Sequence, residues 1–410
     1  MAWTIRPAAA EDVRELVRAD QAAFGGRPSD VQIEESRAFL ELDRTYVAVD
    51  GGRIVGTAGA LSLELTVPGP ATVPVAGITF VGVVPTHRRR GILTALLARL
   101  LDDARRRHEP MSALLASEAT IYGRFGYGVA VTTEAVEIQR PHAALRRPVE
   151  LTGRLRMLEP AEMAEVLPPL HDRYRRLQPG EVSRSRGWWA RRLADREDRR
   201  EGASARFAVL WEGAPGQEPS GYLRYRIRGS WEDGVPGHTL EVEELIALTP
   251  EVRAGLWQYC FNVDLVALVK AGNVAVDEPL TWRLADPRRL RVWGRNDMLW
   301  LRLLDVEAAL GTRTYTSDET VVLDVVDRSG TAAARYRLTG CGDEGAVCGR
   351  TDRPGDLALD VVELAAAYLG GVRFTTVARA GLVSELTPGA LARADAMFAV
   401  APAPYCCTGF

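Results

Sequence analysis

Apolar positions near the N-terminus follow a strand pattern, then a helix pattern, and then strand patterns again. Trp3 to Pro7 is short and apolar enough for a strand, whereas Ala9 to Phe24 carries its apolar residues at helical spacing. Arg44 to Val49 and Arg53 to Leu65 flank an Asp-Gly-Gly sequence, which is typical of a hairpin turn. This part of the chain therefore predicts a strand, a helix and a β-hairpin.

The next stretch predicts a buried strand followed by a long helix. Val75 to Val84 is nearly all apolar, as expected of a central strand that is covered on both faces. Gly91 to Arg107 has leucines at helical spacing and ends in three arginines, which suit the negative end of a helix. Ser112 to Ala116 gives one more strand. The order predicts an α/β fold built on a mixed sheet.

A weaker copy of this order follows later in the chain and indicates a degenerate internal repeat. Its strands are predicted at Phe207 to Trp211, Gly221 to Ile227 and Glu241 to Leu248, and its helix at Val252 to Cys260. The turn before this helix contains Glu251 and no run of arginines. Because an acidic residue repels anions, we expect the second copy to be structural.

From about Asn296 the pattern changes to short strands and short helices. Strands are predicted at Glu319 to Val326 and Ala334 to Thr339, and helices at Val361 to Leu369 and Pro388 to Met397. This region predicts a small α+β module after the two α/β units.

Composition narrows the class of protein and its environment. Of 410 residues, 47% are hydrophobic and 26% are charged, the formal net charge is −3, and no apolar run approaches the length of a membrane span. We expect a cytoplasmic protein whose partners are neither nucleic acids nor membranes. The cysteines are five in number, scattered and without a histidine nearby, so they predict free thiols and no metal site: Cys260, Cys341, Cys348, Cys406 and Cys407.

The stretch from Val81 to Ile92 carries the first chemical signal. An apolar strand leads through a proline-marked turn and three arginines to Gly91, where a helix begins. Backbone N–H groups at a helix N-terminus attract anions, and glycine lets the backbone approach them closely. Arginines at such a turn can hold phosphates by charge-assisted hydrogen bonds. The segment is able to bind a diphosphate, and a solvated helix end is the alternative.

The order of strand, Arg88, two further residues and Gly91 resembles the acetyl-CoA signature of the GNAT acyltransferases. The chain departs from that pattern at Leu93, where the family has glycine or alanine. The resemblance implies acetyl-CoA as cosubstrate. The residues it assigns to the cosubstrate are the strand backbone and the basic turn: Val81, Val83, Arg88, Arg89, Gly91 and Ile92.

A second segment matches the family at the position that follows the next strand. GNAT enzymes carry Tyr-x-x-x-Gly-[Phe/Tyr] there, and the match falls on Tyr122, Gly126 and Tyr127. The first tyrosine acts in the family as the general acid for the departing thiolate. The phenol pKa of about 10 is close enough to the pKa of an alkyl thiol for this proton transfer. The alternative is a turn whose aromatic residues pack on the sheet.

Amine acetylation also needs a base, and residues 71–86 contain no Asp, Glu or His that could serve as one.

The whole chain resembles the Eis family. The resemblance rests on the chain length, the second unit and two segments, Pro-Thr-His-Arg-Arg-Arg-Gly and Ile-Tyr-Gly-Arg-Phe-Gly-Tyr-Gly. Those enzymes bring the terminal carboxylate into the active site, which implies Phe410 as general base. Glu118 is the rival base. Phe24 and Thr79 fall where the family lines its substrate pocket.

The resemblance implies two tandem GNAT mixed-sheet domains and a C-terminal α+β domain similar to sterol carrier protein, over residues 1–143, 144–295 and 296–410. It also implies a homo-oligomer, commonly a hexamer. We expect an N-acetyltransferase acting on a small-molecule or peptide amine, namely an aminoglycoside-like compound, a polyamine, a peptide or a lysine side chain. Thr408 and Gly409 are not acidic, unlike the acidic pocket residues of aminoglycoside-acetylating members, which argues against polycationic antibiotics as substrates and leaves other primary amines open. The alternative is a non-catalytic CoA- or lipid-binding regulatory protein.

Overall fold

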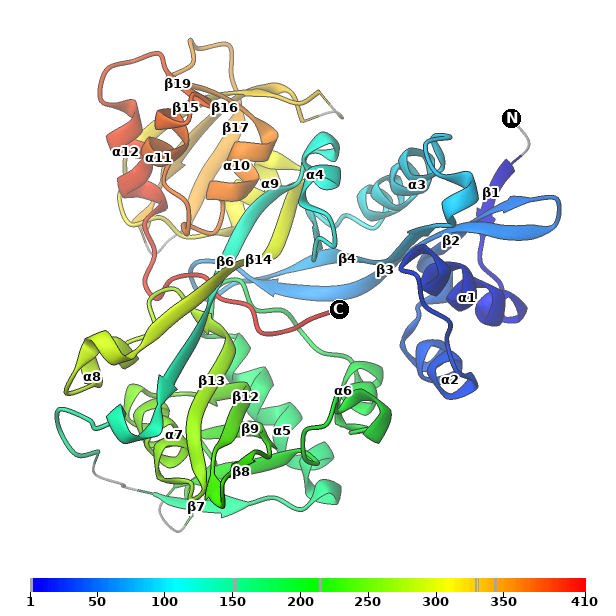
Figure 1. The fold of residues 1–410 in the computed structure, drawn as a ribbon. Coiled ribbons are helices and arrows are strands. Elements are labelled where there is room, and N and C mark those ends of the chain that lie inside the picture. The colour runs from blue at the N-terminus through cyan, green and yellow to red at the C-terminus, as the bar shows by residue number, and fades with distance from the viewer. Residues whose placement is uncertain (1–2, 150–152, 214–215, 329, 331, 343–344) are drawn as a thin grey trace. The chain divides into compact units, whose positions relative to one another are not determined.

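The computed structural model describes residues 3–149, 153–213, 216–328, 330, 332–342 and 345–410 (Figure 1). The chain divides into two compact units. The first unit combines the N-terminal segment up to Val131 with residues 297–404 and 408–410. The second unit combines residues 132–296 with residues 405–407.

The first unit is built on a mixed sheet. Its strand order is β1-β2-β3-β4-β5-β14, with β4 and β5 parallel and the other neighbours antiparallel. The strands are β1 (Trp3–Pro7), β2 (Thr45–Asp50), β3 (Arg53–Thr66), β4 (Thr72–Val83), β5 (Met111–Leu114) and the end of β14 (Arg291–Leu303). This confirms the strands predicted in this part of the chain to within a few residues.

Helices cover both faces of this sheet (Figure 1). Side chains alternate between the faces of a strand, so Val47 packs with helix α1 and the adjacent Ala48 packs with helix α3. Burial on both faces over most of its length explains why β4 is nearly all apolar. The helices are α1 (Val13–Ala23), α2 (Asp30–Phe39), α3 (Ile92–Arg106) and the short α4 (Ala119–Tyr122).

Helix α2 had not been predicted, although its sequence contains a start signal. Ser29 accepts a hydrogen bond from the Gln32 backbone N–H at 3.3 Å, and Gln32 accepts one from the Ser29 N–H at 2.8 Å. This reciprocal pair is a capping box, which satisfies N–H groups at a helix start. The helix predicted from Ala9 begins instead with a 3₁₀ turn at Ala10–Asp12 and becomes α-helical at Val13.

The C-terminal module of the first unit has a sheet of its own, in the order β17-β16-β15-β18-β19. Its strands are β15 (Thr320–Val326), β16 (Ala334–Gly340), β17 (Ala346–Arg350), β18 (Leu357–Asp360) and β19 (Val383–Glu385). Its helices are α9 (Val306–Thr312), α10 (Val361–Ala367), α11 (Phe374–Arg379) and α12 (Ala390–Phe398). The predicted α+β character of this region is confirmed.

The second unit repeats the mixed-sheet pattern in the order β6-β13-β12-β9-β8-β7, with β12 and β13 parallel. Its strands are β6 (Gly128–Gln139), β7 (Arg154–Met157), β8 (Phe207–Glu212), β9 (Gly221–Arg228), β12 (His238–Ala247) and β13 (Val266–Ala275), beside the two-stranded ribbon of β10 (Trp231–Glu232) and β11 (Val235–Pro236). Its helices are α5 (Pro160–Arg175), α6 (Arg186–Leu193), α7 (Pro250–Asn262) and α8 (Leu280–Arg283). Within the described part of the chain, every helix is too short or too polar to cross a lipid bilayer.

Candidate active site

Strands β4 and β5 separate in the middle of the first sheet. Their pairing ends where Ile78 lies opposite Leu114, the last residue of β5, while β4 continues to Val83. Backbone N–H and C=O groups that leave a sheet need new partners. The last residues of β4, including the predicted contacts Val81 and Val83, are therefore able to pair with an extended ligand.

A β-bulge interrupts β4 at the same place. The register with β3 passes from Thr79 directly to Gly82, so Phe80 and Val81 have no partner in it. Phe80 has a φ of 51°, and its carbonyl accepts a hydrogen bond from the Thr57 hydroxyl at 2.8 Å. Bulges re-aim backbone groups and occur often beside active sites. This bulge turns the Val81 region away from the β3 ladder.

Helix α3 begins beside this strand end without a side-chain cap. Gly91 is the N-cap residue, with a φ of 82° that favours glycine, and no side chain accepts from the first turn. A Cβ on Gly91 would find no protein atom within 4 Å. The space beside Gly91 is therefore open, and the first-turn N–H groups have no side-chain cap, which fits an anion.

The arginines of this turn differ in their contacts. Arg88 donates to the Ala23 carbonyl at 2.7 Å and to the Val83 carbonyl at 3.4 Å, so it ties the turn to the end of α1. Arg89 is exposed and has a φ of 61°. Arg89 is therefore better placed than Arg88 for a phosphate, and the predicted phosphate role of Arg88 stays a prediction.

Tyr122 ends the short helix α4 and is 5% exposed. Its ring meets the ring of Tyr127 edge-on, with centroids 6.1 Å apart. Burial raises the pKa of Tyr122 above its ordinary value, a hydrogen bond with Ser117 opposes the shift, and the nearby charge of Glu118 adds to it. The phenol is therefore protonated at neutral pH, as a general acid must be. Glu118 itself is exposed.

Tyr127 has a structural role in the same core. It is fully buried, and its hydroxyl shares a 2.7 Å hydrogen bond with Ser112, whose own hydroxyl lies 3.1 Å from the Ala76 carbonyl. Burial raises the pKa of Tyr127 to about 12. This tyrosine ties the residue before β6 to Ser112 of β5, which agrees with the packing alternative for its position.

Phe410, the last residue, lies against β4. A Cβ on Gly77 would stand 3.2 Å from the Phe410 ring and would also clash with Leu63. Phe410 is half-buried, whereas the preceding Gly409 is exposed. The absence of a side chain at position 77 thus gives the terminal ring its place on the strand.

The α1 face of β4 carries the predicted pocket residues. Gly82 faces this helix, since a Cβ there would stand 3.0 Å from Ala23 Cβ and 3.3 Å from Asp20 Cα. Phe24 follows at the end of α1 and is 58% exposed, and Thr79 on β4 is half-buried. Both stay predictions as pocket residues.

Asp20 is a buried carboxylate that sequence reasoning missed, at 5% exposure. It continues the apolar positions Val13, Leu16 and Val17 along the buried face of α1. A carboxylate in a helical stripe of apolar residues was the signal that could have found it.

Residues 405–407 of the C-terminal tail are held in the second unit by hydrogen bonds. Tyr405 donates its backbone N–H to the Pro179 carbonyl at 2.9 Å and its hydroxyl to the Asn273 carbonyl at 3.0 Å. Asn273 donates to the Cys406 carbonyl at 3.2 Å, and Glu181 accepts from the Cys407 N–H at 2.7 Å. The tail is fixed here, in contrast to most chain ends.

The corresponding helix of the second unit differs at its start. Thr249 caps α7 by accepting from the Val252 N–H at 3.3 Å, so one N–H that an anion would bind is already satisfied. Gly255 lies within α7 against the Trp211 ring, and Arg253 pairs with Glu278. These contacts support the expectation that the second copy is structural.

Comparison with protein families matches three parts of the chain. Residues 4–130 match an acetyltransferase (GNAT) domain, and residues 180–303 match a second acetyltransferase (GNAT) domain. Residues 306–407 match a sterol carrier protein domain. The predicted fold class of two GNAT domains and a sterol-carrier-protein-like domain is confirmed.

Similar proteins extend over nearly the whole chain. An uncharacterized N-acetyltransferase of Streptomyces avermitilis is 42% identical over 95% of both chains. N-acetyltransferase Eis of Mycobacterium tuberculosis is 34% identical over 88% of both chains. The crystal structure of Eis1 from Mycobacterium abscessus is 37% identical, covers 99% of this chain and 100% of its own, and superposes with a TM-score of 0.87.

Proposed function

Because the chain belongs to the Eis family of GNAT N-acetyltransferases, we propose that it transfers the acetyl group of acetyl-CoA to a primary amine by direct attack. The observation that carries this proposal is the separation of β4 from β5 beside the uncapped start of α3. The strand edge suits an extended chain with amide groups, and the helix start suits the diphosphate of the same molecule. These two features fit the pantetheine amides and the diphosphate of acetyl-CoA.

Two residues of this unit supply the proton transfers in the proposal. The amine nitrogen attacks the thioester carbon, and the terminal carboxylate of Phe410 takes the proton that the nitrogen loses, directly or through a water. A backbone N–H at the bulge near Val81 holds the oxyanion of the tetrahedral intermediate. Tyr122 then gives its phenolic proton to the sulfur as the C–S bond breaks.

The strength of the base is the least favourable part of this scheme. An α-carboxylate has an ordinary pKa of about 3.5, so it is a weak base in water. Its contribution therefore depends on position, which the contact of the Phe410 ring with β4 at Gly77 supports. Glu118 is the less favoured base because it is exposed.

The class of primary amine that serves as substrate can be identified by testing a panel of amines. The panel contains an aminoglycoside, a polyamine, a lysine-containing peptide and a simple monoamine, each incubated with acetyl-CoA while release of the CoA thiol is followed. Thiol release that requires an amine supports the enzyme. Tight CoA binding without release for every amine favours the non-catalytic alternative and overturns the proposal.

We further propose that the enzyme is a cytoplasmic homo-oligomer, a hexamer by family resemblance. The five cysteines are all free thiols, which suits a reducing compartment. Trp282 and Trp293 of the second unit are 77% and 57% exposed, and large exposed aromatic side chains are typical of subunit interfaces. Light scattering coupled to size-exclusion chromatography measures the assembly, and a monomer at working concentrations contradicts it.

Gly91→Ala tests the diphosphate site against a matched control. Gly389 is also the N-cap of a helix, with a φ of 84° against 82° for Gly91, so alanine strains both positions equally. We expect each variant to lose about 1–2 kcal/mol of stability. Only Gly91→Ala should weaken acetyl-CoA binding, by roughly tenfold to a hundredfold, because its methyl group obstructs one or two charge-assisted hydrogen bonds.

Calorimetric titration with acetyl-CoA and thermal unfolding measure the two effects separately. Equal acetyl-CoA affinity in the two glycine variants would place the diphosphate elsewhere.

A further inference from the structure

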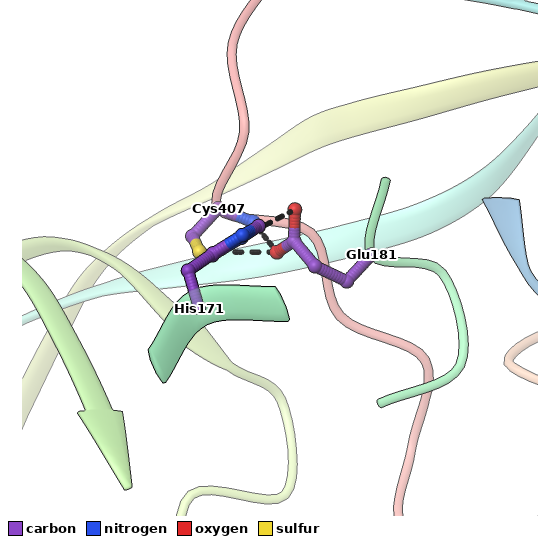
Figure 2. Close-up of side chains that lie close together, drawn as sticks. All are labelled: His171, Glu181 and Cys407. Atoms are coloured by element: carbon purple, nitrogen blue, oxygen red, sulfur yellow. Dashed lines mark hydrogen bonds and ion pairs between the residues drawn. The ribbon is translucent and has the colours of Figure 1, made fainter. Parts of the chain in front are cut away.

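An imidazole, a carboxylate and a thiol meet inside the second unit (Figure 2). They belong to His171 on helix α5, Glu181 after that helix and Cys407 of the C-terminal tail. One possible metal-ligand atom from each residue lies within 4.8 Å of the other two. His171 is 1% exposed and Glu181 is 0% exposed, whereas Cys407 is partly exposed. The reaction proposed above uses none of these groups.

The imidazole has an unused nitrogen directed at this cluster. His171 Nε2 is buried and has no hydrogen-bond partner among the described residues. Its nearest carboxylate oxygen, Glu181 Oε1, is 3.7 Å away, which is too far for a hydrogen bond. A buried polar atom without a partner costs about 1–3 kcal/mol. Such a nitrogen is the kind of atom that a metal ion binds.

The carboxylate and the thiol are already oriented toward each other. Glu181 Oε2 accepts from the Cys407 backbone N–H at 2.7 Å and from the Cys407 thiol at 3.0 Å. Glu181 Oε1 accepts from the Val182 N–H at 3.1 Å and lies 3.9 Å from Cys406 Sγ. These contacts fix the carboxylate beside both the imidazole and the Cys407 sulfur (Figure 2).

The separations are near those around a small tetrahedral ion. Zinc–ligand bonds of about 2.0–2.3 Å place tetrahedral ligands roughly 3.3–3.8 Å apart. His171 Nε2 lies 3.7 Å from Glu181 Oε1, and Cys407 Sγ lies 3.0 Å from the other oxygen, Oε2. One candidate atom from each of the three residues lies within 4.8 Å of the other two, so small side-chain rotations bring them to bonding distance of one ion. Mg²⁺ and Ca²⁺ prefer oxygen ligands alone, so nitrogen, oxygen and sulfur together favour zinc.

A positive charge close to the cluster opposes the binding of a cation. Arg184 lies 3.3 Å from Cys407 Sγ and pairs with Glu244 at 2.5 Å, and Arg224 pairs with the same carboxylate at 3.0 Å. The guanidinium of Arg184 opposes a cation, so the thiolate must supply much of the affinity. A cavity of about 890 Å³ borders His171 and Arg184 and gives an ion a route to this point.

We propose that His171 Nε2, Cys407 Sγ and one carboxylate oxygen of Glu181 bind a zinc ion. Binding releases the proton of the Cys407 thiol to solvent and leaves the fourth ligand position of the ion to water. Spacing along the chain did not indicate this site, because Glu181 and Cys407 are 226 positions apart. The expectation of no metal had rested on spacing along the chain.

The test uses the untagged full-length protein after treatment with a chelator. It is incubated with Zn²⁺ and desalted for elemental analysis, and separately with Co²⁺ for its thiolate charge-transfer absorption in the near ultraviolet. We expect about one zinc per chain and a cobalt–thiolate band. Cys407→Ser and His171→Gln should each reduce zinc retention by about tenfold or more, the loss expected on removal of one ligand.

Cys341→Ser is the matched control, since it removes a partly exposed thiol from the C-terminal module and should leave both signals unchanged. Circular dichroism checks the fold of each variant. If Cys407→Ser does not fold, His171→Gln decides the question alone. A wild-type protein that retains no zinc and gives no cobalt band, or a His171→Gln protein that binds like wild type, overturns the proposal.

Discussion

Removal of Phe410 should lower kcat by roughly 10²–10⁴-fold, the range expected on loss of a positioned general base, while acetyl-CoA still binds. The shortened chain still ends in a carboxylate, on Gly409, but that group stands one residue back, about 3.3–3.6 Å along an extended chain. It also lacks the ring that lies against β4 at Gly77. The deletion therefore displaces the terminal carboxylate and does not remove it.

Two matched proteins separate the carboxylate from the ring. A semisynthetic chain with a C-terminal carboxamide keeps the Phe410 ring and removes the charge, so it should lose nearly as much turnover as the deletion. Phe410→Leu keeps the carboxylate and an apolar side chain, so it should retain much more activity. Steady-state kinetics with saturating acetyl-CoA and amine give kcat, and calorimetry gives cosubstrate affinity. Full activity in the carboxamide protein would assign the base to another group.

Tyr122→Phe should lower kcat by roughly 10²-fold or more, because the thiolate then leaves without a proton donor. The substitution removes one oxygen atom and keeps the buried ring that packs against Tyr127. Its effect on acetyl-CoA affinity should therefore be small.

Tyr127→Phe is the control for this substitution. It also removes a buried hydroxyl from the same ring pair, and it breaks the 2.7 Å hydrogen bond with Ser112. We expect it to cost about 1–3 kcal/mol of stability because Ser112 loses a buried partner, with turnover close to wild type. Equal loss of turnover in the two variants would mean that Tyr122 acts through packing.

The pH dependence of kcat gives an independent test of Tyr122. Burial raises its pKa above the ordinary value, so the phenol remains protonated to a higher pH than an exposed tyrosine. Activity that depends on this proton is then complete at neutral pH and is lost only above the ordinary tyrosine pKa of about 10. A tyrosine ionisation below that value in a spectroscopic titration, absent from Tyr122→Phe, would contradict the assignment.

The sequence alone determined those features that depend on residues close together along the chain. The apolar strand before Arg88 and the helix that starts at Gly91 were predicted from local pattern, and the Tyr122 segment was found as a motif, although its short helix α4 was not predicted. The repeat of the strand and helix order predicted a second unit. The capping box at Ser29 was also readable, and helix α2 was missed only because that signal was not used.

The sequence could not specify how a side chain in a predicted motif is used. Arg88 lies in the basic turn, yet its guanidinium donates to the carbonyls of Ala23 and Val83. The Arg-Ala-Gly sequence at 253–255 could be read as a weaker copy of the first turn, but Thr249 caps that helix. Such differences depend on neighbours that come from other elements.

Tertiary structure alone decided which distant residues meet. The Phe410 ring reaches Gly77 from the far end of the chain, and His171, Glu181 and Cys407 share one buried cluster. The physical reason is that helix and strand periodicity record which face of an element is buried, whereas a cluster depends on how whole elements pack. The sequence therefore predicted the cosubstrate turn and the proposed acid, and the fold decided where Phe410, the proposed base, lies and which groups surround it.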